Sequence, residues 1–315
     1  MMKKFLCLTL ALCLLLLTAC GGGTEPQQEE TAETAVTFTD GLGREVTVDR
    51  PRRVACLIGS FADIWYLAGG VETIVATAND TWTYFDLPLG EDVVNLGATK
   101  ELSLEQIVAC EPDFILASTN TENQVALEPT LTEMGLNVAY FDVTNFADYL
   151  DMLELCTEIT GCRENYETYG EAIRGQVEDA MARADGSQPT VLYIRASGSG
   201  CKVKGSEGSV LGEMLADLDT VNIADRDNGL LEELSLEVIL REDPDYIFAV
   251  YQSNDPAVAQ EVMETTLLTN PAWATLTAVK EGRYYVMDPT LYNLKPNEKW
   301  GDAYEGLAEI LYPAD

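Results

Sequence analysis

The amino-acid sequence predicts an α/β protein built from two lobes, and three observations carry that prediction. Strand-like apolar runs alternate with helical stretches in both halves of the chain, as in mainly parallel sheets covered by helices on both faces. One helix-turn-strand segment occurs twice, and a long helical stretch separates the two halves. We therefore expect two Rossmann-like lobes joined by one long helix.

The repeated segment is the most specific of these observations. Residues 102–117 read LSLEQIVACEPDFILA, residues 234–249 read LSLEVILREDPDYIFA, and the two align without a gap. Each copy begins at a candidate N-cap, Ser103 or Ser235, and continues as a short apolar-periodic helix. A Pro-Asp break and a buried strand follow in both. Two copies of one unit indicate two similar lobes.

The remaining elements follow from hydrophobic periodicity. The expected strands are 53–58, 73–76, 114–117 and 138–141 in the first lobe, and 190–195, 246–250 and 283–287 in the second, with 221–223 a weaker candidate. Helical spacing runs from Tyr149 to Ile159 and ends near Gly161. A second helix is predicted over 163–184, with a length of about 33 Å at 1.5 Å per residue. A final helix carries an apolar stripe that we expect in the core: Trp300, Tyr304, Leu307 and Leu311.

The N-terminus has the pattern of an export signal. Lys3 and Lys4 precede a mostly apolar run that is too short to span a bilayer. The run ends in LTACG, which resembles the lipobox of bacterial lipoproteins and so implies cleavage before Cys20 and lipid attachment to its thiol. The alternative is an ordinary secretory signal with an incidental cysteine. The expected organisation is a signal peptide 1–19, a flexible tether 20–36, an N-terminal lobe 37–145, a helical region 146–185 and a C-terminal lobe 186–315.

Charge and composition exclude several functions. With 19 Lys+Arg against 53 Asp+Glu the net charge is −34, which opposes nucleic-acid binding. The chain has no histidine, so Ser-His-Asp triads and His-ligated metal sites are excluded. Five cysteines follow Cys20, an odd number that argues against a disulfide framework and favours small buried apolar residues. A Cys156–Cys162 bridge stays open if the helix stops near Gly161.

Nearly the whole mature chain resembles the class III solute-binding proteins of ABC importers, which serve ferric siderophores, haem and vitamin B12. The matching motifs are TDGLGREVTV at 39–48, both SLE…PD segments, 209–225, 273–283 and LYNLKPNEKWGDAYEGLAEILYP at 291–313. The resemblance implies a ligand cleft between the lobes. It also implies a monomer without enzymatic activity or covalent cofactor, tethered outside the cell membrane, that delivers a metal chelate to a permease dimer with its ATPase.

Within that family, an iron complex of the siderophore type is the leading ligand, with haem or a corrinoid as alternatives. Haem would need Tyr or another non-His axial ligand, and the zinc and manganese relatives rely on histidine. Two further function classes stay open. A surface hydrolase could use paired carboxylates, although no G-x-S-x-G elbow is present. A sensor or scaffold lipoprotein would keep the fold and bind a protein partner.

Candidate ligand residues follow from the loops beyond the carboxyl ends of the expected strands. The loop 80–86 carries Trp82 and Tyr84. Arg195, Lys202 and Lys204 surround a flexible Ser197–Gly200 and suggest a site for an anionic group, the alternative being solvated surface cations. The second-rank candidates are Tyr251, Tyr292 and Lys295.

Two acidic residues are candidates for docking on the permease. Glu105 and Glu237 occupy the same place in the two repeats. By the family resemblance, one acidic residue on each lobe docks onto arginines of the permease dimer. Each glutamate also suits the first turn of its helix, where the helix dipole favours a negative charge.

Overall fold

The computed structural model describes residues 35–226, 228–253 and 255–314. The predicted signal peptide, Cys20 and the tether up to residue 34 lie outside the described residues. The described chain begins with an antiparallel hairpin of β1 (Ala35–Thr39) and β2 (Glu45–Asp49). Asp40 holds the turn, since its carboxylate accepts hydrogen bonds from the backbone of Leu42 and Arg44. The Arg44 side chain bridges Asp40 and Glu128, which ties the hairpin to the first sheet unit.

The first sheet has five parallel strands in the order β5-β4-β3-β6-β7. The strands are β3 (Val54–Cys56), β4 (Ile74–Thr77), β5 (Val94–Asn95), β6 (Phe114–Ser118) and β7 (Val138–Phe141). The helices of this part are α1 (Gly59–Leu67), η1 (Val71–Thr73), α2 (Asp80–Tyr84), α3 (Leu104–Ala109), α4 (Glu122–Val125) and α5 (Glu128–Glu133). All four predicted strands are confirmed, while β1, β2 and β5 were not predicted.

The second sheet has the order β10-β8-β11-β12, with all three neighbouring pairs parallel, and β9 pairs antiparallel with β8. The strands are β8 (Thr190–Ser197), β9 (Gly200–Lys204), β10 (Val221–Asn222), β11 (Tyr246–Tyr251) and β12 (Tyr284–Met287). The three strong strand predictions and the weaker one are confirmed. The prediction of a flexible segment at Ser197–Gly200 is wrong, because these residues form the β8–β9 hairpin.

The helices around the second sheet include the second copy of the repeat, α11. Their bounds are α9 (Val210–Asp217), η3 (Ile223–Asp225), α10 (Asn228–Glu232), α11 (Leu236–Glu242), α12 (Pro256–Met263), η4 (Glu264–Leu268), η5 (Trp273–Thr275), α13 (Thr277–Lys280), α14 (Pro289–Tyr292), η6 (Asn297–Lys299) and α15 (Trp300–Leu311). The repeat is confirmed at its caps, since Ser103 accepts from the Gln106 amide and Ser235 from the Val238 amide.

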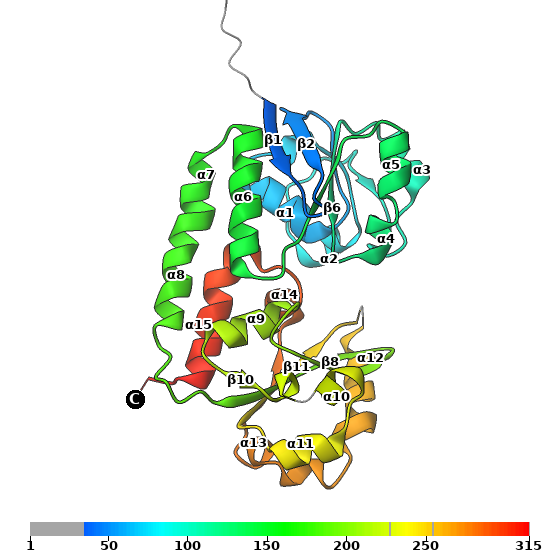
Figure 1. Cartoon of the computed structure of the whole chain (residues 1–315). Coiled ribbons are helices and arrows are strands. Elements are labelled where there is room, and N and C mark those ends of the chain that lie inside the picture. Colours follow the sequence, from blue (N-terminus) through cyan, green and yellow to red (C-terminus); the bar gives the residue numbers. More distant parts are fainter. Residues whose placement is uncertain (1–34, 227, 254, 315) are drawn as a thin grey trace, which may run out of the picture. The chain divides into compact units, whose positions relative to one another are not determined.

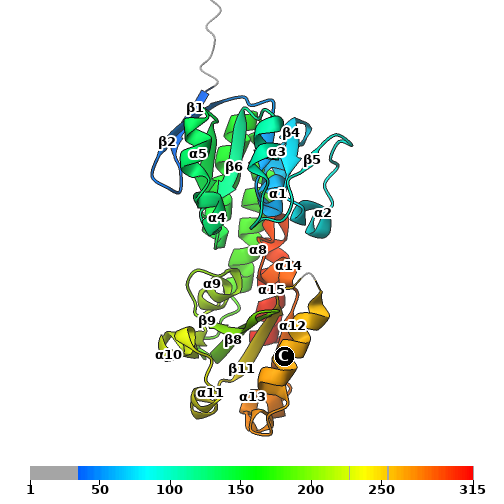
Figure 2. The same cartoon turned by 90° about the vertical axis from the view of Figure 1, so that its right-hand side faces the viewer.

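A helical region lies in sequence between the two sheets (Figures 1 and 2). Helix α6 (Phe146–Thr160) begins with a capping box of Asn145 and Asp148 and ends at Gly161, whose φ of 81° is left-handed. The predicted helix over 163–184 is present over 164–181, but it is not uniformly α-helical. A π-helical stretch, η2 (Glu167–Glu171), separates α7 (Glu164–Tyr166) from α8 (Ala172–Met181).

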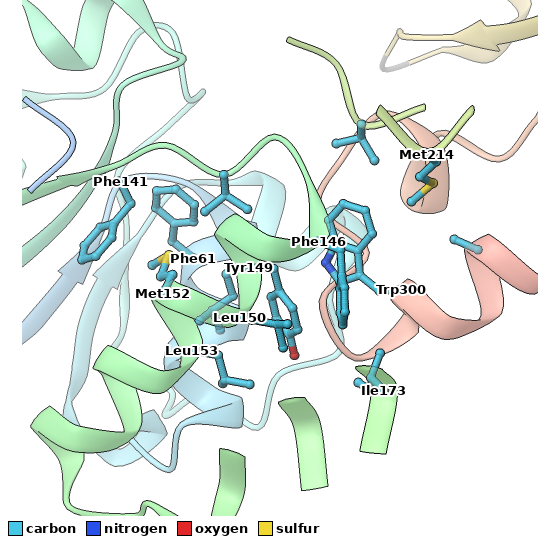
Figure 3. Close-up of a cluster of buried hydrophobic side chains, with 14 of the residues drawn as sticks. Phe61, Phe141, Phe146, Tyr149, Leu150, Met152, Leu153, Ile173, Met214 and Trp300 are labelled. Atoms are coloured by element: carbon cyan, nitrogen blue, oxygen red, sulfur yellow. The ribbon is translucent and has the colours of Figure 1, made fainter. Parts of the chain in front are cut away.

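Each sheet is buried on both faces. Alternate residues of a strand point to opposite faces, so one strand contributes side chains to two apolar clusters. In β3, Val54 and Cys56 belong to one apolar cluster, whereas Ala55 belongs to another. The first of these clusters also takes in one face of the second sheet, together with α6, α8 and α15. Figure 3 shows its centre, where Trp300 packs against Phe146 and Tyr149. The predicted stripe on α15 is therefore confirmed as core.

The five described cysteines are all free thiols. Cys56, Cys110 and Cys156 are buried, as predicted, and Cys162 and Cys201 are half-buried. Among the described residues, no helix is both long and apolar enough to cross a bilayer.

Candidate ligand-binding site

Three cations lie on one face of the second sheet, at the β8–β9 hairpin. Arg195 stands directly opposite Lys202 in the antiparallel ladder, and Tyr193 stands opposite Lys204. Because residues two apart in a strand share a face, Arg195, Lys202 and Lys204 project from the same side. Tyr193 belongs to the cluster that contains α15, so the cations project from that side of the sheet. The strand register thus gathers three of the 19 basic residues in one place.

These cations are not neutralised by the protein. Within residues 35–226, 228–253 and 255–314, none of the three forms an ion pair. The Arg195 guanidinium donates a long hydrogen bond, 3.5 Å, to the Asn293 amide oxygen. Burial lowers the pKa of Lys204, and repulsion from Arg195 and Lys202 lowers it further. Since like charges held together oppose folding, the arrangement favours an anion between them.

An open cavity of about 620 Å³ adjoins this group. Its lining residues are Val203, Lys204, Gly205, Ser206, Glu207, Asp225 and Leu231. Asp225 is engaged, because its carboxylate accepts a 3.0 Å hydrogen bond from the Ser206 amide. Lys204 therefore borders open space.

The aromatic candidates lie beyond the carboxyl end of β4 in the first sheet. The segment 80–86 was expected to be a loop, but its first five residues form the short helix α2. The Asp80 carboxylate accepts from the Gly59 amide at 3.0 Å through both oxygens and so joins α2 to the start of α1. Trp82 is 46% exposed on α2, and Tyr84 is half-buried. An indole with almost half of its surface in water is available for a ligand.

A charged group at the same edge of the first sheet involves the chain's C-terminal segment. Asp80 follows β4 and Asp142 follows β7, and Asp142 accepts a 2.8 Å hydrogen bond from the Asn120 side chain. Lys295 is half-buried and interacts electrostatically with both carboxylates. Burial lowers the pKa of Lys295, and the two aspartates oppose that effect.

Tyr251 and Tyr292 are not brought into the cationic group. Tyr251 pairs in register with Ala196, one residue beyond Arg195, so it lies on the opposite face of the sheet, where its hydroxyl contacts that of Tyr284 at 3.2 Å. Tyr292 is 5% exposed, and its hydroxyl donates to the Ala303 carbonyl. We leave both out of the proposed site.

Glu105 and Glu237 are exposed on α3 and α11, one residue after the start of each helix. Sequence reasoning did not identify Asn293, Asp80 or Asp142 as site residues. The signal available for the two aspartates was their position at strand ends. Among the described residues, no group of three or more Cys, Asp or Glu side chains is placed to hold a metal ion.

Comparison with known proteins places the chain in a family. Residues 54–291 match the periplasmic binding protein family, and the chain therefore belongs to it. The chain is 22% identical over 315 residues to the ABC transporter substrate-binding lipoprotein YvrC of Bacillus subtilis (strain 168), covering 96% of this chain and 95% of the relative. It is 24% identical over 325 residues to the cobalamin-binding protein of Halobacterium salinarum (strain ATCC 29341 / DSM 671 / R1), covering 96% and 84%.

Solved structures show the same fold. The siderophore binding protein BauB, bound to a complex between two molecules of acinetobactin and ferric iron, superimposes with a TM-score of 0.71 at 19% identity. The match covers 89% of this chain and 100% of that chain. The predicted α/β class is thus confirmed, and the family is one of substrate-binding proteins of transport systems.

Proposed function

We propose that this protein is the extracytoplasmic, lipid-anchored binding component of an ABC importer and that it captures an anionic ferric chelate. The carrying observation is the group of Arg195, Lys202 and Lys204, gathered on one face without an ion-pair partner among the described residues. Arg195 suits bidentate binding of a carboxylate or catecholate, and the lysines act as point charges. Binding is non-covalent, in a cleft between the lobes, and the chain works as a monomer without catalysis.

Membrane attachment and the permease partner complete the proposal. The lipobox-like LTACG sequence supports lipidation of Cys20, and the relative YvrC is a lipoprotein of an ABC transporter. Glu105 and Glu237, exposed at equivalent places of the two repeats, are the proposed docking residues for a permease dimer with its ATPase. Two symmetric charges would orient the binding protein on a symmetric partner.

A corrinoid is the second candidate ligand, and a specific observation favours it. Trp82 exposes 46% of its surface beyond β4, where a large planar ligand can stack on the indole. A relative with 24% identity is a cobalamin-binding protein. In that case the aromatic residues, not the cations, would dominate the affinity. Haem is a third candidate ligand. Tyr84, two residues after Trp82, is the tyrosine of this segment that could serve as its axial ligand.

The test is a thermal-shift screen of the soluble chain with ferric tris-catecholate, ferric citrate, a ferric hydroxamate, haem and cobalamin. A ligand at 100 times its Kd stabilises the folded protein by about 2.7 kcal/mol. We expect a shift with an anionic ferric chelate, and Lys202→Ala plus Lys204→Ala should weaken its binding at least tenfold.

Two controls make the result specific. Lys280→Ala plus Arg52→Ala removes the same charge at two exposed sites outside the hairpin and should bind like the wild type. The Lys202/Lys204 variant should melt no lower than the wild type without ligand, because mutual repulsion is removed. A shift with cobalamin alone, lost in Trp82→Ala, would replace the chelate by a corrinoid. No shift with any probe would refute capture of these ligands.

A further inference from the structure

One short segment of the chain contacts both sheet units. We call Asn293–Asn297 the crossing segment. At one end, the Asn293 amide oxygen lies 3.5 Å from the Arg195 guanidinium of β8. At the other end, the Asn297 amide donates to the Ser60 carbonyl at 2.9 Å and to the Asp63 carboxylate at 2.7 Å, both on α1. The segment therefore runs from the cationic face to the edge of the first sheet.

Hydrogen bonds at that edge bring the crossing segment close to Asp80. Asn297 bonds to Ser60, and the neighbouring Gly59 donates its amide to the Asp80 carboxylate. Lys295 stands only two residues before Asn297 in the chain. The two charges act on each other, because Lys295 lowers the pKa of Asp80 against the larger, opposite effect of burial. Asp142 faces the same ammonium group from the end of β7.

This placement gives Lys295 a role other than direct contact with a ligand. In the strand order of the first sheet, β3 and β6 separate β4 from β7, so Asp80 and Asp142 flank the middle of its carboxyl edge. Within the described part of the chain, neither carboxylate forms an ion pair within 4 Å. The three groups together carry a charge of −1 with Lys295 and −2 without it. A ligand with negative charge would be repelled by the uncompensated pair.

We propose that Lys295 is a positioning residue that offsets one of the two negative charges of Asp80 and Asp142, so that an anionic ligand held by the cationic face can approach the first sheet. The inference deepens the proposed function and rests on it for the choice of ligand charge. It makes the crossing segment a specificity element: without the lysine, the acidic edge selects against anions. A neutral ligand would be indifferent to the change.

Binding of two probes tests the proposal. Ferric tris-catecholate carries three negative charges, and a neutral ferric hydroxamate serves as its uncharged counterpart. Lys295→Met should weaken tris-catecholate binding at least tenfold, more at low salt, and leave hydroxamate binding within twofold. Adding Asp80→Asn and Asp142→Asn should restore tris-catecholate binding to within threefold of the wild type, because both Asn side chains keep an acceptor oxygen for Gly59 and Asn120. Lys280→Met is the matched control and should behave like the wild type.

Two results would overturn the proposal. If the triple variant binds tris-catecholate as weakly as Lys295→Met, the lysine contacts the ligand directly. If Lys295→Met binds like the wild type, the lysine has no role in binding.

A ligand-free measurement separates this inference from the proposed function. Lys295→Met should lower the melting temperature more, or raise it less, in the wild-type background than in the Asp80→Asn/Asp142→Asn background, because only the wild type loses an attraction to the two carboxylates. If no probe binds the wild type, the proposed function fails. The comparison of melting temperatures in the two backgrounds then decides by itself whether Lys295 offsets the charge of the two aspartates. Equal effects of Lys295→Met in the two backgrounds would then refute that offset.

Discussion

At the scale of single residues, a few buried polar groups define how α1 meets the C-terminal segment. Asn297 is fully buried at a φ of 53°, and its amide bonds to Ser60 and Asp63. Among the described residues, Asp63 has no cationic partner in direct contact. Burial raises the pKa of Asp63 to about 6. The charge of Glu298 also raises this pKa, whereas the hydrogen bond from Asn297 and the charge of Lys299 lower it. A carboxylate kept there at neutral pH destabilises the folded state.

This residue predicts a defined pH dependence. The folded-state pKa of about 6 lies above the ordinary 3.8, so the destabilisation is absent below about pH 4, develops up to about pH 6 and is complete above it. Asp63→Asn should therefore match the wild type near pH 4 and unfold with about 1–2 kcal/mol more free energy at pH 7, a value reduced for partial exposure. Urea unfolding from pH 4 to pH 8 measures the difference. Parallel profiles for the two proteins would contradict the assignment.

At the scale of elements, local sequence signals set where helices start and stop. In α6, the Asn145 side chain accepts from the Asp148 amide at 2.9 Å, and the Asp148 carboxylate accepts from the Asn145 amide at 3.1 Å. Gly161 ends the helix in a left-handed conformation that favours glycine. The buried side of α6 then contributes five of the side chains labelled in Figure 3: Phe146, Tyr149, Leu150, Met152 and Leu153.

The capping box of α6 predicts a measurable loss. Asn145→Ala removes the acceptor for the Asp148 amide and should lower the free energy of unfolding by about 1 kcal/mol. Asn145→Ser keeps a capping oxygen and should lose only a fraction of that. The midpoints of urea unfolding at fixed pH compare the three proteins. An alanine variant as stable as the wild type would show that the cap contributes nothing.

At the scale of the whole molecule, the chain carries a net charge of −34, and the register of the β8–β9 hairpin brings three of its cations together on one face. With 53 Asp and Glu residues, negative charge alone does not distinguish the two glutamates proposed for docking from the other acidic residues. Their position distinguishes them. Glu105 and Glu237 sit two residues past the Ser caps of α3 and α11, the two copies of the repeat. Both are exposed.

Reversing the charge of the two glutamates tests whether they dock the protein on the permease. Glu105→Lys plus Glu237→Lys should leave ligand affinity unchanged and reduce uptake by cells at least tenfold, because the oriented contact with the permease is lost. Glu133→Lys plus Glu261→Lys makes the same change in charge at two other exposed helical sites and should preserve most uptake. Uptake is measured with radiolabelled iron in a strain lacking the wild-type protein. Equal uptake by the two double variants would exclude docking through the repeat.

The sequence by itself determined the α/β class, the strong strands, the repeat and the core stripe of α15. These features depend on local patterns, such as apolar periodicity, Ser caps and Pro-Asp breaks, which act within one element. It did not determine the conformation of short segments. Part of the aromatic segment 80–86 is helical, and the helix predicted over 163–184 contains a π-helical stretch. In both places tertiary packing overrides a weak local preference.

Only the tertiary structure decided which candidate residues share a surface. A shift of one residue along a strand reverses the face, and the register therefore places Arg195, Lys202 and Lys204 together while Tyr251 lies on the other side. Asp80, Asp142 and Lys295 are far apart in the chain and meet only at the edge of a folded sheet. Contacts of that kind depend on strand order and chain crossing, which no local pattern of residues encodes.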